Sequence, residues 1–243
     1  MNVRAPARLV WVALLLAGAA TPYVAPDNIA NADFVGPPAP RPKLPIITVV
    51  PLGDVDPTLI EFVAASLERR FYFEVRVNAP LPHPAAAWYV PRHRWRAEKI
   101  LDALDELELG DTWRVAAITE APISTTKGPV FDWGIAGLGS MDGKSCVFTA
   151  YLFRRFKQKE PETYRRFMEN LIIHEVGHTL GLDHCPLDRC IMADAKGNAI
   201  RSARISTNEF CPRCHRLIQR YLRAAAVQGT WSAAELRLVG ESL

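Results

Sequence analysis

The chain alternates between short apolar runs and segments whose apolar residues recur every three to four positions. Five segments hold β-branched or aromatic residues in continuous or alternating runs bounded by turn residues, and this pattern predicts strands. Glycine and aspartate in residues 139–144 predict a turn between the last two of them. The predicted strands are residues 46–52, 71–77, 113–119, 130–138 and 145–153.

Four further segments carry apolar side chains at helical spacing. Residues 57–70 and 161–180 each begin with a proline, which suits the first turn of a helix. Residues 92–109 precede Gly110, where a helix can end, and residues 212–227 form the last predicted helix. Because these helices are interspersed among the strands, we expect an α/β (α+β) fold with a mixed twisted sheet covered by helices.

The N-terminal part of the chain differs in composition from the rest. Arg4 and Arg8 precede a short apolar run and small residues, so residues 1–20 are predicted to be a secretory signal peptide. The apolar run is short for a membrane-spanning helix, and an uncleaved anchor is the alternative. Residues 21–45 contain seven prolines and are predicted to be an extended linker. We therefore expect a secreted or periplasmic protein.

The remainder, residues 46–243, is predicted to form one domain. About half of the 243 residues are hydrophobic (49%), which suffices for a sizeable core. The net charge is only +3 and no basic face is evident, which argues against a nucleic-acid-binding protein. We expect no stable membrane association beyond the leader, and a monomer.

The most specific motif spans residues 174–184 and reads HEVGHTLGLDH. On a helix, His174 and His178 lie one turn apart on the same face, so both imidazoles can bind one metal ion. Zinc takes nitrogen ligands in tetrahedral sites. Glu175 lies about 100° further around the helix, beside the ion, where a general base for a zinc-bound water is needed.

The same motif provides a third ligand. Gly181 permits the left-handed conformation that ends a helix, and the chain can then turn to bring His184 to the ion. Three protein ligands leave the fourth position open for water, as in catalytic zinc sites. The spacing therefore predicts a catalytic zinc bound by three histidines, with Glu175 as the base.

This eleven-residue motif resembles that of the metzincin metallopeptidases. Those proteins carry a methionine in a tight turn beneath the metal, and Met192 fits that role. Some add a tyrosine ligand beyond the methionine, but residues 193–196 contain no tyrosine, so that ligand is not expected. The resemblance also implies that substrate pairs with an edge strand, for which residues 130–138 are the candidate; an ordinary sheet strand is the alternative.

Four of the five cysteines follow the third histidine and form two pairs with 20 residues between them, a spacing typical of structural zinc. Together with the histidine motif, the segments HC, CIM and CPRC resemble the archaemetzincin family, and the resemblance extends over most of the mature domain. It implies two zinc ions, one catalytic and one structural, the second clamping a small C-terminal subdomain from about residue 182. The four cysteines are Cys185, Cys190, Cys211 and Cys214.

Disulfides are the competing interpretation of these cysteines. A leader peptide implies an oxidising compartment, where Cys185–Cys190 and Cys211–Cys214 could form and leave Cys146 unpaired. The spacing favours zinc, because it suits a closed four-thiolate site. We expect Cys146 to be a buried small hydrophobic residue.

Zinc-dependent hydrolysis of peptide bonds is the predicted function, with a peptide or protein as substrate. A catalytically inactive, zinc-stabilised protein-binding module is the alternative, although an intact Glu175 favours the enzyme. A disulfide-stapled adhesion domain is a third interpretation, which leaves the three histidines unexplained.

Overall fold

The computed structural model describes residues 45–71 and 73–227. The signal peptide predicted for residues 1–20, nearly all of the predicted linker and residues 228–243 lie outside the described residues. The assignments made for them therefore stay predictions. Within the part that is described, no helix has the length and apolar character that crossing a membrane requires.

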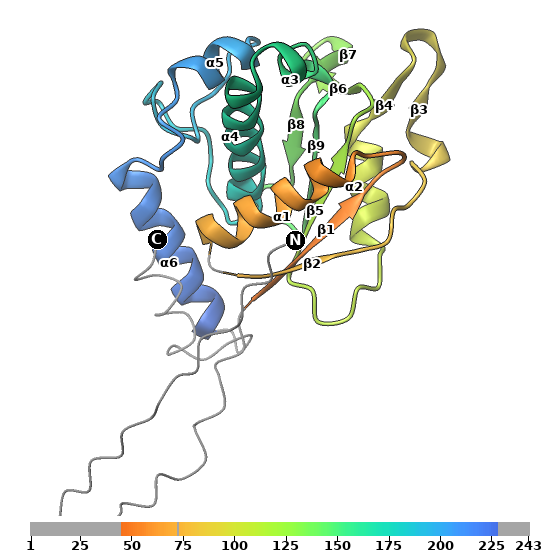
Figure 1. Cartoon of the computed structure of the whole chain (residues 1–243). Helices are drawn as coiled ribbons and strands as arrows, with labels where there is room; N and C mark the ends of the chain where they lie inside the picture. Colours follow the sequence, from red (N-terminus) through yellow and green to blue (C-terminus); the bar gives the residue numbers. More distant parts are fainter. Residues whose placement is uncertain (1–44, 72, 228–243) are drawn as a thin grey trace, which may run out of the picture. The chain divides into compact units, whose positions relative to one another are not determined.

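A five-stranded sheet forms the centre of the fold (Figure 1). In spatial order its strands are β2 (Glu74–Val77), β1 (Ile46–Pro51), β5 (Arg114–Thr119), β9 (Ser145–Thr149) and β8 (Gly137–Gly139). The first four run parallel, and β8 lies antiparallel at one edge. The three central strands are buried along their whole length, as expected for parallel strands covered on both faces.

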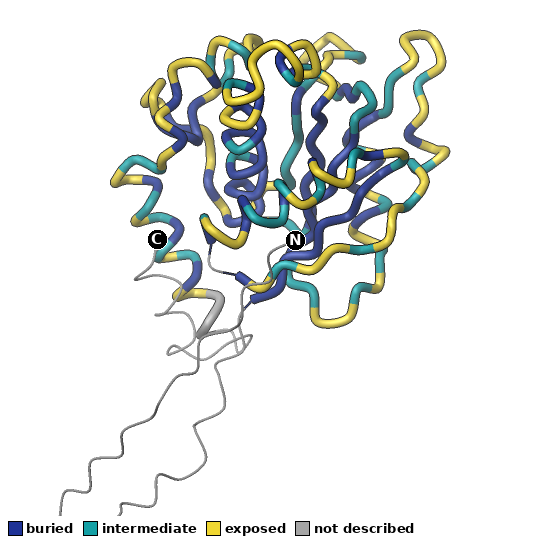
Figure 2. The backbone as a smooth tube through the Cα atoms, viewed as in Figure 1, coloured by how far each residue is buried: buried dark blue, intermediate teal, exposed yellow. Residues whose placement is uncertain are grey.

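Helices cover both faces of this sheet. Helices α1 (Pro57–Phe71) and α4 (Pro161–Thr179) pack on one face, where Ile47 and Phe148 contribute to the larger apolar core. Helix α2 (Ala97–Asp105) packs on the other face in a second core. Figure 2 shows the central strands as buried segments between exposed outer surfaces. The predicted α/β class is confirmed.

A second, four-stranded sheet lies beside α2. Its order is β3 (Trp88–Tyr89), β4 (Arg94–Arg96), β6 (Ile123–Lys127) and β7 (Val130–Ile135). Strands β6 and β7 pair antiparallel, and β7 lies at the edge. The prediction of one strand over residues 130–138 is therefore wrong: the chain passes from an edge of one sheet to an edge of the other at Ala136.

The predicted helix 92–109 is correct only over residues 97–105. A 3-10 turn, η2 (Val90–Arg92), precedes strand β4, and α2 follows directly. Strand β4 forms because it pairs with β3 and β6, and because Trp95 stacks on His83 with ring centroids 4.4 Å apart. Strand β6 is almost thirty residues away along the chain, so the helical spacing of the leucines after β4 made the predicted helix begin too early.

Two predicted strands are shorter than expected. Phe71 ends α1 instead of beginning a strand; its ring stacks on Phe73 at 5.7 Å, so the apolar alternation there reflects core packing. Strand β9 ends at Thr149, whose hydroxyl accepts the N–H of Tyr151, and a 3-10 turn (η3, Tyr151–Phe153) follows.

Helix α6 (Pro212–Val227) lies where residues 212–227 predicted one. Strands β3 and β6 and three short helical segments were not predicted, since their sequences carry no strong periodicity. Those segments are η1 (Ala85–Ala87), α3 (Phe156–Lys159) and α5 (Ala199–Ile205).

Candidate active site and metal centres

The C-terminal end of α4 turns the chain back toward its own histidines. Gly181 has φ +74°, and its N–H donates to the carbonyl of His178 at 3.0 Å. The N–H of Leu182 donates to the carbonyl of Gly177 at 3.1 Å. This Schellman pattern requires a left-handed residue, which glycine adopts without strain. The reversal brings His184 alongside the helix.

The three predicted histidines come together at this bend. One ring nitrogen from each of His174, His178 and His184 lies within 4.8 Å of the others. The Nε2 atoms of His174 and His178 are 3.1 Å apart. A tetrahedral zinc with Zn–N distances of about 2.0–2.1 Å needs nitrogens about 3.3 Å apart. The geometry therefore fits the ion that the sequence predicts.

Backbone carbonyls orient two of these rings. Nδ1 of His174 lies 2.8 Å from the carbonyl of Ile191, and Nδ1 of His178 lies 2.7 Å from that of Leu182. With Nδ1–H donating to a carbonyl, Nε2 carries the free lone pair that a metal requires. Burial lowers the pKa of His174 to about 3 and lowers that of His178, which favours the neutral imidazoles that bind zinc.

Glu175 is buried against the edge strand β8. A Cβ on Gly137 would lie 2.5 Å from its carboxyl carbon, and a Cβ on Gly139 would lie 2.5 Å from its backbone oxygen. Only glycine permits this approach of strand and helix. Burial raises the pKa of Glu175 to about 8, opposed by a hydrogen bond from the backbone N–H of Gly139. A cation bound next to Glu175 would also lower the pKa of its carboxyl group, as that hydrogen bond does.

These two glycines were not predicted to be part of the site. Their spacing of two residues places both on one face of a strand, and this was the only sequence signal.

Met192 lies beneath the histidine-bearing turns of α4. It is fully buried, and a Cβ on Gly177 would come within 2.6 Å of its sulfur. The N–H of Ala193 donates to the carbonyl of Cys190 at 3.0 Å, closing a tight turn around the methionine. Met192 therefore occupies the position expected of the turn methionine.

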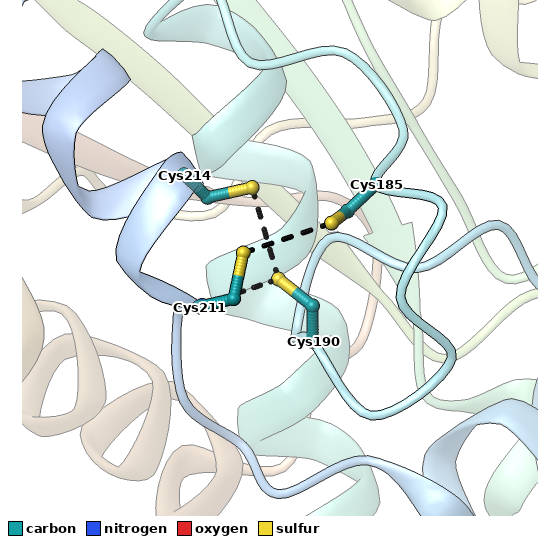
Figure 3. A group of neighbouring side chains, drawn as sticks. All are labelled: Cys185, Cys190, Cys211 and Cys214. Atoms are coloured by element: carbon teal, nitrogen blue, oxygen red, sulfur yellow. Dashed lines mark hydrogen bonds between the residues drawn. The ribbon is translucent and has the colours of Figure 1, made fainter.

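The four cysteines after the third histidine form one cluster, shown in Figure 3. The sulfur of Cys185 lies 3.7 Å from that of Cys211, and the sulfur of Cys190 lies 3.8 Å from that of Cys214. A tetrahedral zinc with Zn–S distances of about 2.3 Å needs sulfurs about 3.8 Å apart, whereas a disulfide needs about 2.0 Å. The donor set thus fits a closed four-thiolate site.

The neighbouring pairs in this cluster also differ from those of the disulfide interpretation. Each close pair joins the loop after α4 to the start of α6, and all described cysteines are free thiols. Burial raises the pKa of the thiols of Cys190 and Cys214, so thiolates here need a bound cation to stabilise their charge. Cys146, as expected, is fully buried in β9, away from the cluster.

A cavity of about 360 Å³ opens beside the histidines. Its lining includes His174, Glu175 and His184, residues of β7 and β8, and Asp194. Its size is within the range of small ligand pockets. A peptide side chain can therefore be accommodated next to the candidate metal.

A polar network anchors the end of α4 to α6. The buried Arg114 donates from Nε to the carbonyl of Thr179 at 3.0 Å and from Nη2 to the hydroxyl of Tyr221. That hydroxyl donates to Asp142, whose N–H donates to the carbonyl of His178 at 3.0 Å. The sequence carried no signal for this network, because its members come from four separate segments.

We expect Tyr221→Phe to lower the free energy of unfolding by about 1–3 kcal/mol, because it leaves the buried guanidinium of Arg114 short of one acceptor. Urea denaturation would measure the change. Tyr89→Phe, on the other sheet, is the control and should change it by less than about 0.5 kcal/mol. Equal effects of the two substitutions would contradict a role for the network.

Comparison with known proteins finds one family that matches this chain over more than half of its length. Residues 72–220 match the family model described as peptidase family M54. The chain is 26% identical over 178 residues to the archaemetzincin of Halobacterium salinarum (strain ATCC 29341 / DSM 671 / R1), covering 71% of this chain and 98% of that protein. It is 27% identical over 194 residues to the archaemetzincin of Pyrococcus furiosus, a match that covers 76% of this chain and 97% of that protein.

Solved structures agree with the sequence matches. The crystal structure of archaemetzincin from Methanopyrus kandleri superposes with a TM-score of 0.63 at 26% identity, covering 76% of this chain and 99% of that one. The crystal structure of Archaeoglobus fulgidus archaemetzincin, complexed with malonate, superposes with a TM-score of 0.59 at 25% identity. This match covers 71% of this chain and 99% of that one. The core of the chain thus matches these proteins over almost their full length.

Proposed function

The chain belongs to peptidase family M54, the archaemetzincins, which makes it a zinc metallopeptidase; from this premise we propose that its three clustered histidines hold the catalytic zinc and that Glu175 is the general base. The observation that carries the proposal is the convergence of one nitrogen from each of His174, His178 and His184 within 4.8 Å, with the carboxyl of Glu175 buried beside them. Peptides or proteins are the substrate class.

Bound by these three histidines, zinc would supply Lewis acidity, which lowers the pKa of a water ligand to about 7 and polarises a carbonyl. The protein's own contribution begins with Glu175, whose carboxylate accepts a proton from the attacking water and returns it to the amine of the leaving peptide. Its position against Gly137 and Gly139 limits its movement, so it faces the reacting atoms at little entropic cost.

We also propose that substrate pairs with β8. This strand lies at the edge of its sheet with β9 on one side and follows the edge strand β7 along the chain. Antiparallel pairing to an edge strand supplies backbone hydrogen bonds that depend little on the side chains of the substrate. Preference for particular side chains therefore arises in the adjoining cavities.

A second zinc is proposed for Cys185, Cys190, Cys211 and Cys214, giving two ions per chain. The sulfur separations of 3.7 and 3.8 Å support this, as they match a tetrahedral thiolate site. Since Cys185 directly follows His184, a closed site here also restrains the third catalytic ligand.

Elemental analysis of the purified full chain, combined with an assay on a peptide library, tests the proposal. We expect two zinc ions per chain and hydrolysis of peptide bonds. Two zinc ions without hydrolysis would support the inactive binding module instead. No zinc, together with two disulfides, would support the stapled adhesion domain and contradict both metal sites.

A further inference from the structure

The catalytic cleft continues into a second cavity along β7. The first cavity, which holds His174 and Glu175, and the second share Trp133, Gly134 and Ile135 in their walls. The second cavity is also lined by Arg92, Arg94, Asp132, Pro122 and Tyr151. A peptide that extends from the metal centre along β8 and β7 therefore reaches a polar, charged region.

Arginine outnumbers acid in this second cavity. Arg92 and Arg94 both face the same oxygen of Asp132, at 3.7 and 3.4 Å. A third arginine, Arg154, does not line the cavity but stacks on its Tyr151, with the guanidinium carbon 3.7 Å from the ring centroid. The Asp132 side chain is only 9% exposed, whereas those of Arg92 and Arg94 are 61% and 26% exposed. One recessed carboxylate thus leaves accessible guanidinium groups and a net positive charge.

The distance from the metal centre suits a short peptide. Gly137 lies against the carboxyl of Glu175, and a Cβ on Gly134 would lie 2.8 Å from Nη1 of Arg94. Three extended residues span about 10 Å at about 3.3 Å per residue, and the bend at Ala136 makes this an upper bound for the distance from Gly137 to Gly134. Antiparallel pairing, the more stable arrangement, directs the C-terminal side of a substrate from β8 toward β7.

We propose that Arg92 and Arg94 form a carboxylate-binding subsite for the substrate about three residues beyond the scissile bond. The carboxylate is either the free C-terminus of a short peptide or the side chain of aspartate or glutamate. Guanidinium groups bind carboxylates through paired hydrogen bonds, which makes arginine the suitable residue for such a subsite. This inference rests on the proposed function of β8 as the rim of the cleft.

Two pairs of quenched fluorogenic peptides test the subsite and separate the sources of the carboxylate. One pair ends three residues after the cleaved bond, with a free C-terminus or an amide. The other pair is longer and amidated, with glutamate or glutamine at that third position. We expect kcat/KM for the carboxylate member of at least one pair to exceed its partner by about tenfold, the effect of one charge-assisted hydrogen bond.

The arginine variants identify the groups responsible. In Arg92→Gln/Arg94→Gln the ratio within each pair should fall to about one, whereas Asp132→Asn should raise it by removing the competing carboxylate. Arg165→Gln, which loses an exposed pair with Glu162 on α4, is the matched control and should keep the ratio. A ratio of one in the unaltered protein, or an unchanged ratio in the double variant, would overturn the subsite.

A binding measurement keeps this test independent of turnover. Fluorescence anisotropy with the same peptide sequences, carrying the fluorophore without the quencher, should give the same tenfold difference in Kd on zinc-loaded Glu175→Gln. If this Kd difference is found but the unaltered protein does not cleave the peptides, the subsite is upheld and the peptidase mechanism is contradicted. If the protein cleaves the peptides but kcat/KM and Kd are the same for both members of each pair, the subsite is contradicted and the peptidase mechanism is not.

Discussion

Replacing Glu175 by glutamine is expected to lower kcat for peptide hydrolysis by about 10²–10⁴-fold, while the protein stays folded and keeps its zinc. Glutamine has nearly the same shape as glutamate, so the side chain still fits between α4 and the glycines of β8. Its amide cannot accept the proton of the attacking water. The loss should therefore fall on kcat and leave the zinc content unchanged.

Steady-state kinetics and elemental analysis on the same preparation check this result. Glu169→Gln is the control, since Glu169 lies on the same helix and pairs with Arg69 at 3.4 Å on the protein surface. It should retain full activity. If Glu175→Gln kept full activity, Glu175 would not be the base; if it lost zinc, its role would be structural.

Replacing Cys214 by serine is expected to remove one zinc ion per chain and to unfold the C-terminal part of the domain. Structural zinc binds small domains with an apparent free energy of about 10–16 kcal/mol, which is comparable to the total stability of about 5–15 kcal/mol of a typical domain. Cys214 is nearly fully buried and lies 3.8 Å from the sulfur of Cys190. Losing it leaves buried thiols without the cation that balances their charge.

Elemental analysis, thermal unfolding and limited proteolysis measure these changes. We expect the zinc content to fall from two to one and cleavage to begin beyond residue 182. Activity should fall too, because Cys185 adjoins His184. Cys146→Ala is the control: Cys146 is buried in β9, outside the cluster, so both zinc ions should remain.

Treatment of the unaltered protein with a thiol reductant separates zinc from disulfides. We expect no loss of stability, since the close sulfur pairs are too far apart for S–S bonds. Unfolding by the reductant with zinc content unchanged would instead identify disulfides as the stabilising links.

The candidate catalytic centre could be predicted from the sequence because its geometry is local. His174 and His178 share a helix face, and Gly181 ends that helix in a left-handed turn that returns His184 within three residues. Each step depends on neighbours along the chain, so spacing alone predicted the candidate ligand set. The cysteine cluster was predicted as a group for the same reason, by spacing typical of zinc sites.

Pairing between distant segments could not be predicted in the same way. Strand β4 depends on β6, almost thirty residues away, so the sequence around Trp95 was taken for a helix. The break at Ala136 could not be predicted either. The segments on both sides of it favour strands, and they form two strands because each pairs with a different sheet.

The sequence by itself therefore determined the α/β class and predicted the candidate metal ligands and the candidate base, through local periodicity and spacing. Only the tertiary structure decided which cysteine sulfurs face one another and that the carboxyl of Glu175 packs against Gly137. The tertiary structure alone also placed arginines of β4 beside β7. The physical reason is that these contacts join residues far apart along the chain, and their energies appear only when the sheets and helices have assembled.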